Sequence, residues 1–429
     1  MLVLKNHLFM STIVKHVEIS KLWDYKSISI DLNEDVNILI GSNGTSKTTV
    51  LRIIEAILKV ELLEIDEIYF EKAMITLQEN SIEHIILVTR ILVDGVSFIY
   101  RYHIDNEDAV DISYQELRSP YIHIRQSSRK SMNYLRNCIS ELVNISWLSI
   151  TRFDDTDNRP TDSNDVDRKL TKLMRDVVSF RLELETKVNQ RTKKFNEDVV
   201  SLLLYNEQID ALPDKDMYAV IDNFSEEDLR KELHRVFSYF GTPRNHTEDI
   251  DNHVKRIQTL KSIMNNKEMI SGKDLLSLSL LNRTTRMLTL SKDYQSDRSE
   301  IMEPVKKFVE IIGSFIKDKD FSFSDQGEFQ IILRRNTKEG RTLQIRSLSS
   351  GEKQLLILLI ETLLQRKTNY VFIADEPELS LHIEWQRNLI RSIRELNPNA
   401  QILFATHAPE IAANFPKKLI LMERVTKYE

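Results

Sequence analysis

The sequence predicts an α/β fold: a largely parallel sheet, an antiparallel β elaboration, and a helical, short coiled-coil insertion. Residues 36–40 form an apolar strand-like run that leads into a glycine loop, and helix-spaced apolar residues follow it. After residue 340, strand-like and helix-like segments alternate, which is typical of a parallel sheet covered by helices. Residues 166–204 instead carry apolar side chains at helical spacing. We therefore expect a phosphate-loop (P-loop) head in two halves, separated by helices.

The composition limits the class of protein. The chain has 429 residues, 41% hydrophobic and 29% charged, which suffices for a large core. The net charge of −6 excludes a wholly basic nucleic-acid coat, whereas a local basic groove stays open. A single cysteine, Cys138, excludes an intrachain disulfide framework and a Cys-x-x-Cys metal site, and it fits the cytoplasm. Without a run of 18 apolar residues we expect no membrane partner. Met10, before Ser11, offers a second start codon.

We expect the two parts of the head to cover residues 1–152 and 301–429, with the helical insertion over 153–300. Six aspartates between 154 and 167 indicate a solvated loop, because their spacing matches no calcium loop. In the first part we expect strands over 12–40, a helix over 47–60, antiparallel strands over 67–125 that include Ile122 and Ile124, a helix over 131–142 and a strand over 145–150.

The insertion reads as three helices, over 166–204, 225–240 and 250–264. A helix of ~40 residues spans about 60 Å, which suits an arm rather than a long rod. In the last part of the chain we expect helices over 304–316, 352–364 and 383–396, and strands over 321–324, 329–334, 343–346, 370–374, 401–405 and 418–422.

The glycine loop Gly41–Thr48 reads G-S-N-G-T-S-K-T and predicts a nucleotide phosphate site. Its glycines let the backbone approach the phosphates, and its amides form a positive nest at a helix N-terminus. Lys47 adds a point charge, and Thr48 offers a hydroxyl to magnesium. Ser46 replaces the usual third glycine, and its side chain fits if the local backbone stays helical. The expected nucleotide-binding residues are Gly41, Asn43, Gly44, Thr45, Ser46, Lys47, Thr48 and Thr49.

Two carboxylates, Asp375 and Glu376, follow the apolar run Val371–Ala374. A buried strand would place them at its carboxyl end, where open α/β sheets bind ligands. We expect Asp375 to hold Mg²⁺ through water and Glu376 to polarise the attacking water. For an isolated Asp-Glu pair, a charged turn would be the simpler interpretation.

Two further segments complete the predicted site. Leu348–Gln354 reads L-S-S-G-E-K-Q; Ser349, Ser350 and Gly351 open a helix whose N-terminus attracts anions, although an ordinary helix cap explains the same pattern. His407 follows the strand-like run 402–405 and could hydrogen-bond a phosphate or a water.

Spacing favours the functional interpretation. Gly351 precedes Asp375 by 24 residues (375 − 351), and His407 follows it by 32 (407 − 375). Each interval has room for one helix and one strand, so all four segments are in order for one ATPase site. Because the signature segment Ser349–Gly351 would cap a nucleotide held by another copy, we expect an ATPase that closes only on dimerisation.

These motifs resemble the ABC-type ATPase head shared by SMC-like repair proteins and the OLD (overcoming lysogenization defect) family. Residues 375–382 resemble the D-E-P-E-x-x-L-H of the OLD-like branch, and residues 405–410 resemble its A-T-H-S-P-E. The resemblance covers about residues 12–60 and 340–422, and it implies ATP, Mg²⁺ and a homo-oligomer. By position it places Ser380 and His382 against the opposite subunit, with Gln126 as the candidate for the glutamine loop.

The chain departs from both named groups. OLD nucleases carry a TOPRIM domain after the histidine strand, whereas 22 residues follow His407 here (429 − 407). SMC-like repair ATPases carry a very long coiled coil with a Cys-x-x-Cys hook. What remains resembles the stand-alone ATPase subunits of anti-phage systems such as PARIS and Septu, which implies a separate nuclease or toxin as effector.

Three alternatives stay open. A DNA-repair ATPase would share these motifs, and a nucleotide-dependent scaffold with negligible turnover is compatible with Ser46. A transporter ATPase subunit fits less well, because its phosphate loop and signature normally lie closer than the 300 residues here (348 − 48). Nucleic acid could meet Arg191 with Lys193 and Lys194, or Arg334 with Arg335, although solvated faces are the simpler interpretation.

Overall fold

A computed structural model describes residues 12–93, 97–148, 165–207, 225–241, 246–265, 271–324, 327–334 and 341–429. Its contacts divide the chain into two compact units, Met1–Val178 with Lys307–Glu429, and Ser179–Lys306. The choice between Met1 and Met10 as the start lies outside the described residues, as do the aspartates from 154 to 162 and Arg335.

The first unit contains a five-stranded parallel sheet in the order β14-β3-β13-β12-β8. Strands β3, β13 and β12 bury most of their apolar residues, and they are joined in register: Asp375 aligns with Ala405, and Ala405 aligns with Leu39. The expected parallel sheet is therefore confirmed, and its strands end at one common edge. The bounds are β3 Val36–Ile40, β8 Ile145–Leu148, β12 Tyr370–Asp375, β13 Ala400–Ala405 and β14 Leu419–Leu421.

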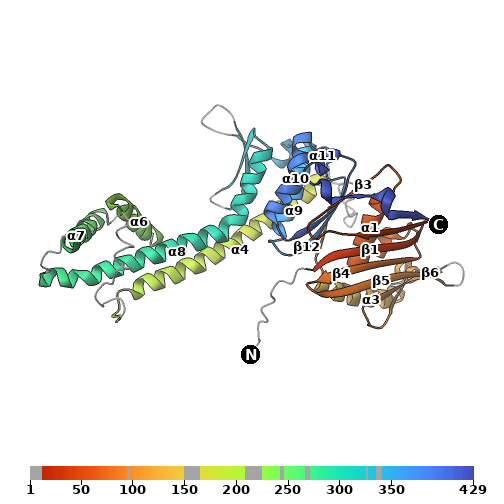
Figure 1. Ribbon diagram of the computed structural model, residues 1–429, viewed down its shortest axis with the longest axis horizontal. Coiled ribbons are helices and arrows are strands. Elements are labelled where there is room, and N and C mark those ends of the chain that lie inside the picture. The colour runs from red at the N-terminus through yellow and green to blue at the C-terminus, as the bar shows by residue number, and fades with distance from the viewer. Residues whose placement is uncertain are drawn as a thin grey trace. The chain divides into compact units, whose positions relative to one another are not determined.

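A seven-stranded antiparallel sheet in the order β15-β2-β1-β4-β5-β6-β7 belongs to the same unit. Figure 1 shows β1, β4, β5 and β6 side by side, in red and orange. The antiparallel elaboration is thereby confirmed, and the first two strands and the last strand of the chain are part of it. The bounds are β1 Thr12–Leu22, β2 Lys26–Asp31, β4 Lys72–Glu79, β5 Ile82–Val93, β6 Ser97–Ile104, β7 Val110–Ser113 and β15 Thr426–Tyr428.

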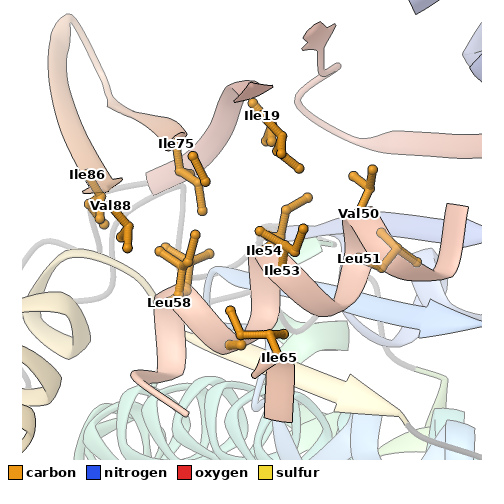
Figure 2. Close-up of a cluster of buried hydrophobic side chains, with 14 of the residues drawn as sticks. Ile19, Val50, Leu51, Ile53, Ile54, Leu58, Ile65, Ile75, Ile86 and Val88 are labelled. Carbon is orange, nitrogen blue, oxygen red and sulfur yellow. The ribbon is translucent and has the colours of Figure 1, made fainter. Parts of the chain in front are cut away.

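Helix α1 (Lys47–Lys59) is buried on most of its circumference, because apolar residues surround it. In Figure 2 its side chains Val50, Ile54 and Leu58 point toward Ile19 of β1 and toward β4 and β5. Val371 and Leu403 of the parallel sheet belong to the same core. Packing between the two sheets fixes the helix, and the phosphate loop that precedes it is fixed with it.

Several predicted elements are wrong in type or extent. Ile122 and Ile124 lie in helix α3 (Ile122–Leu142) rather than in a strand. Helix α8 runs from Gly272 to Phe315 and passes through Pro304, which the sequence suggested as its start. Of the strand expected over 343–346, residues 345–347 form a 3-10 turn, and the neighbouring strand β11 is Arg341–Thr342.

Helices α9 and α10 and strands β9 and β10 of the first unit match expected elements, whereas the short helices and turns between them were not predicted. β11, β10 and β9 form a small antiparallel sheet. No helix in the described part of the chain is long and apolar enough to cross a membrane. The bounds are η1 Leu62–Ile65, α2 Tyr114–Arg118, β9 Lys319–Phe323, β10 Phe329–Leu333, η2 Ile345–Ser347, α9 Ser350–Leu364, α10 Ile383–Leu396, α11 Pro409–Ala412, η3 Pro416–Lys418 and α12 Met422–Val425.

The second unit is helical. It contains α6 (Glu226–Tyr239), α7 (Thr247–Asn265), and parts of α4 (Asp165–Ser201) and α8. One core joins Leu233 of α6, Val254 of α7 and Leu281 of α8. A second core places Phe195 of α4 against Tyr294 of α8, with ring centroids 5.0 Å apart. The predicted helical insertion is thus a packed bundle with its own cores.

Candidate active site at the edge of the parallel sheet

The phosphate loop occupies the six residues between β3 and α1. Gly44 has φ +85°, a left-handed conformation that favours glycine. Ser46 is also left-handed, with φ 71° and ψ 22°, so the backbone does not stay helical where the third glycine was expected. For a non-glycine residue this costs about 1–2 kcal/mol. The loop is therefore strained at the position directly before Lys47.

The loop is closely packed at its first glycine. A Cβ atom on Gly41 would lie 2.8 Å from Thr45 Oγ1 and 3.1 Å from the Glu423 carboxylate. Glu423 Oε1 accepts hydrogen bonds from the Ser42 amide at 2.9 Å and from the Ser42 hydroxyl at 3.1 Å. The hydrogen bond from the Ser42 amide is the largest cause of the lowered pKa of Glu423, and the bond from the Ser42 hydroxyl adds to it. A carboxylate from α12, which the sequence analysis did not identify, thus anchors the loop.

Lys47 is folded back into the loop and is 6% exposed. Its ammonium donates to the Gly41 carbonyl at 2.8 Å and to the Ser42 carbonyl at 3.3 Å. Burial lowers the pKa of Lys47, while the nearby carboxylates of Asp375, Glu376 and Glu423 act in the opposite direction. The cation is held inside the concave loop, where an incoming phosphate would meet it.

Thr48 and Asp375 join the loop to the end of β12. The Thr48 hydroxyl donates to Asp375 Oδ1 at 3.1 Å. Burial raises the pKa of Asp375, the Thr48 bond opposes that rise, and Glu376 adds to it. Hydroxyl and carboxylate oxygens are ligands that Mg²⁺ accepts, and Mg²⁺ sites usually add phosphate oxygens and water. Thr48 and Asp375 supply one oxygen of each kind next to the phosphate loop. No group of three or more His, Cys, Asp or Glu residues in the described ranges could hold a metal.

Glu376 has an unusual backbone. Its φ is 47°, in the left-handed region, and its amide donates to the Ala405 carbonyl at 2.8 Å. Such strain in a non-glycine residue persists only where neighbouring contacts impose it, and it concentrates at functional sites. The bond to Ala405 ties the candidate base to the end of β13.

Glu378 was quoted in the sequence motif without a role, and the structure supplies one. Its Oε1 accepts hydrogen bonds from the Thr406 hydroxyl and from the amides of His407 and Ala408, both at 3.2 Å. Burial raises the pKa of Glu378, and its Oε2 is buried without a described partner. The only sequence signal was a second carboxylate two residues after Glu376.

His407 is exposed at the same edge. It lines a hollow of about 360 Å³ together with Gly41 and Pro409. Strand β13 lies between β3 and β12, so the turn that carries His407 lies between the phosphate loop and Asp375. The edge therefore brings together Lys47, Thr48, Asp375, Glu376 and His407, as the sequence predicted.

Ser349 and Ser350 have different environments. Ser349 caps α9 in a capping box: its amide donates to Glu352 Oε2 at 2.8 Å, and the Glu352 amide donates to its hydroxyl at 3.3 Å. Ser350 is exposed, and its hydroxyl has no hydrogen-bond partner among the described residues. The cap interpretation is thus correct for Ser349, while Ser350 stays available.

The remaining signature residues pack onto the loop that follows β12. A Cβ atom on Gly351 would lie 2.3 Å from the Ser380 carbonyl oxygen, so only glycine fits. Gln354 Nε2 donates to the Pro377 carbonyl at 3.1 Å. In the part of the chain that the structure describes, no hydrogen bond or ion pair joins Ser349–Gly351 to the phosphate loop.

The other candidates differ in what they contact. His382 caps α10, and its side chain accepts a hydrogen bond from the Glu384 amide at 3.4 Å. The Thr45 hydroxyl donates to the Ser42 carbonyl at 2.8 Å, which stabilises the loop, and Asn43 is exposed at its tip. Gln126 is exposed on α3.

A family model described as AAA ATPase domain matches residues 13–412. The chain is 28% identical over 171 residues to the Retron Vc95 probable ATPase of Vibrio cholerae serotype O1 biovar El Tor, covering 36% of this chain and 30% of that protein. It is 26% identical over 159 residues to the Retron Ec83 probable ATPase of Escherichia coli, covering 32% of this chain and 29% of that protein. The matches thus span less than a third of each relative.

Two solved structures are similar in part. One is the Smc head domain with an extended coiled coil, bound to the C-terminal domain of ScpA, from Pyrococcus furiosus, with a TM-score of 0.44 and 13% identity over 94% of this chain and 92% of that chain. The other is an SmcHead bound to the C-winged helix domain of ScpA, with a TM-score of 0.40 and 11% identity over 94% of this chain and 91% of that chain.

Proposed function

Because this chain belongs to the AAA ATPase domain family, we propose that it binds ATP with Mg²⁺ and hydrolyses ATP at an ABC-type site that a second copy of the chain completes. One observation carries the proposal. The sheet edge assembles Lys47, Thr48, Asp375 and Glu376 within one chain, whereas Ser350 is exposed with its hydroxyl unpartnered among the described residues.

The residues of the edge have distinct roles. Lys47 leaves the carbonyls of its own loop and pairs with the β- and γ-phosphates, helped by the loop amides. Thr48 and Asp375 would hold Mg²⁺, which offsets phosphate charge when bound. Glu376 orients the attacking water and accepts its proton, and the exposed imidazole of His407 donates to or accepts from the same water or the γ-phosphate.

The second copy contributes its signature helix. Ser350 at the start of α9 presents a hydroxyl and the positive end of a helix to the γ-phosphate held by the other chain. Ser349 does not take part directly, because its hydroxyl caps α9. Bound ATP stabilises the closed oligomer, since it contacts both chains only in that state, and hydrolysis releases it.

We further propose that the ATPase senses infection and controls a separate effector, a nuclease or toxin, in the cytoplasm. The names of the two relatives, both retron probable ATPases, support this role. The placement beside PARIS- or Septu-like ATPase subunits rests on the sequence motifs. Purification of the chain from its native host tests the effector: a stoichiometric nuclease or toxin is expected, and its absence contradicts this part of the proposal.

A dilution experiment tests the composite site. Turnover per chain should fall as the protein is diluted, because the site exists only in the oligomer. Ser350→Arg should lose turnover without a change in melting temperature, since Ser350 is exposed. Ser140→Arg, an exposed change on α3, is the charge-matched control and should keep wild-type turnover. Full turnover of Ser350→Arg contradicts the proposal.

A further inference from the structure

We propose that Arg168, Lys172, Arg175 and Arg346 form a binding site for the phosphate backbone of a nucleic acid, and that ion pairs connect this site to the signature helix α9. All four residues are exposed and line one hollow of about 480 Å³ in the first unit. Nothing in the ATPase site uses them.

The cations on α4 share one face. Arg168, Lys172 and Arg175 are spaced i, i+4 and i+7, which places their side chains in a row along the helix. Arg346, from the turn η2 directly before the signature segment, joins them at the same hollow. A row of like charges costs stability, because neighbours of one sign on a helix repel each other. Arg168 also lies in the first turn of α4, where the helix dipole disfavours a cation.

Three of the four cations lack an acidic partner among the described residues. Lys172, Arg175 and Arg346 form no ion pair with any residue in the described ranges. The acid at this hollow, Asp167, is engaged with Lys353 at 2.8 Å. The hollow therefore presents uncompensated positive charge, and its natural occupant is a polyanion.

Three of the five basic residues that the sequence suggested for nucleic acid have a different environment. Arg191 pairs with Asp297, Lys193 lies 4.0 Å from Glu197, and Arg334 pairs with Asp320. Each has a carboxylate that reduces its attraction for phosphate. The hollow on α4 is thus the better candidate.

The length of the row matches a strand rather than a single anion. Seven residues of helix rise about 10 Å, which covers about three phosphates of one nucleic-acid strand. No aromatic side chain lines the hollow among the described residues, so the hollow offers no aromatic platform for stacking bases. The site therefore contacts the backbone and does not read the sequence of bases.

Two ion pairs link α4 to α9. Asp167 contacts Lys353, and Lys169 contacts Glu361 at 2.8 Å. Burial raises the pKa of Glu361, and the nearby ammonium of Lys169 opposes that rise. A nucleic-acid strand bound to α4 would change the geometry of these two ion pairs and so shift the position of Ser350. This coupling rests on the proposed role of Ser350, whereas binding itself does not.

Binding is measured first, without nucleotide, by the anisotropy of a labelled 30-mer duplex and its single strand on the full chain at several salt concentrations. The double variant Lys172→Glu with Arg175→Glu should weaken binding at least about tenfold and reduce the slope of log K against log salt by about 2. Lys193→Glu with Lys194→Glu, the matched control on the same helix, should bind as the wild type does. Inorganic phosphate at matched ionic strength should not displace the DNA.

The outcomes separate the two halves of the inference. Equal losses in both double variants, no loss in either, or displacement by inorganic phosphate would overturn the binding site. ATPase turnover is then measured with and without the same DNA. Lys353→Met should keep DNA binding and lose the change in turnover that DNA causes in the wild type. If the wild-type protein binds DNA but its turnover does not change, the coupling is overturned. If the wild-type protein shows no turnover under any condition, the proposed ATPase activity is contradicted instead.

Discussion

The sheet edge and the signature segment differ in how completely one chain satisfies them. At the edge, Lys47, Thr48, Asp375 and Glu378 all have partners within the chain, and three strands hold them in register. At the signature segment, Ser349 and Gly351 are fixed by a capping box and a close contact, while Ser350 faces solvent. This difference is what the proposed composite site requires, because one chain then holds the nucleotide and Ser350 is left exposed for a second copy.

The largest effect should come from the edge. Glu376→Gln removes the proposed general base, so turnover should fall by about 10²–10⁴-fold while ATP still binds. The closed oligomer should then persist, because nothing releases it. Single-turnover hydrolysis measures the loss of turnover, and size-exclusion chromatography with ATP measures the persistence of the oligomer. Turnover within about threefold of the wild type would remove Glu376 from the mechanism.

Gly351→Ala should have the next largest effect. It should lower the stability of the fold as well as turnover. The new Cβ would lie 2.3 Å from the Ser380 carbonyl oxygen, so α9 or its neighbouring loop must move, at a cost of about 1–3 kcal/mol. Thermal unfolding should show a lower melting temperature. Gly313→Ala, inside α8 with nothing within 4 Å of its Cβ, is the control and should stabilise the chain. Equal melting temperatures for the two variants would contradict the packing described.

Much of the parallel sheet and of the site at its edge could be predicted from sequence. Long apolar runs bounded by glycine or charge gave the parallel strands and α9 correctly, because burial on both faces leaves an unambiguous pattern. Short alternating patterns were a poor guide, because Ile122 and Ile124 alternate as in a strand but lie in α3. Pro304 was predicted as a helix start, although α8 passes through it. The left-handed conformation of Ser46 and the bonds of Glu378 were beyond the sequence, since both depend on residues distant along the chain.

Glu378 should have an intermediate effect, because it positions His407 without contacting substrate. Glu378→Ala removes three accepted hydrogen bonds and should lower turnover about tenfold, whereas Glu378→Gln keeps an acceptor and should retain most of it. Nearly equal activity of the two variants would contradict the positioning role.

The pH dependence of stability sharpens this test. Because burial raises the pKa of Glu378, the folded state holds the proton more tightly than the unfolded chain does. Stability should therefore fall as pH rises from 4.5, the ordinary value, through the raised pKa. Glu378→Gln should not show this decrease. In urea unfolding, its free energy of unfolding relative to the wild type should therefore increase as pH rises from 4.5 to the raised pKa, and stay constant above it. An advantage that shrinks with rising pH would show the opposite shift.

The smallest effect should come from the phosphate loop. Ser46→Gly removes the strain of a left-handed serine and should raise the free energy of unfolding by about 1 kcal/mol. Ser46→Ala keeps the strain and should show no such gain. Urea unfolding of both variants decides it, and a stabilised alanine variant would contradict the strain described.

The composite site is tested most directly by mixing two inactive variants, Lys47→Ala and Ser350→Arg. Each alone should lack turnover, because every site contains one defective half. In a mixture, the intact phosphate loop of one chain meets the intact signature of the other, and about a quarter of wild-type turnover should return by random pairing. A mixture that stays as inactive as its components would contradict the account.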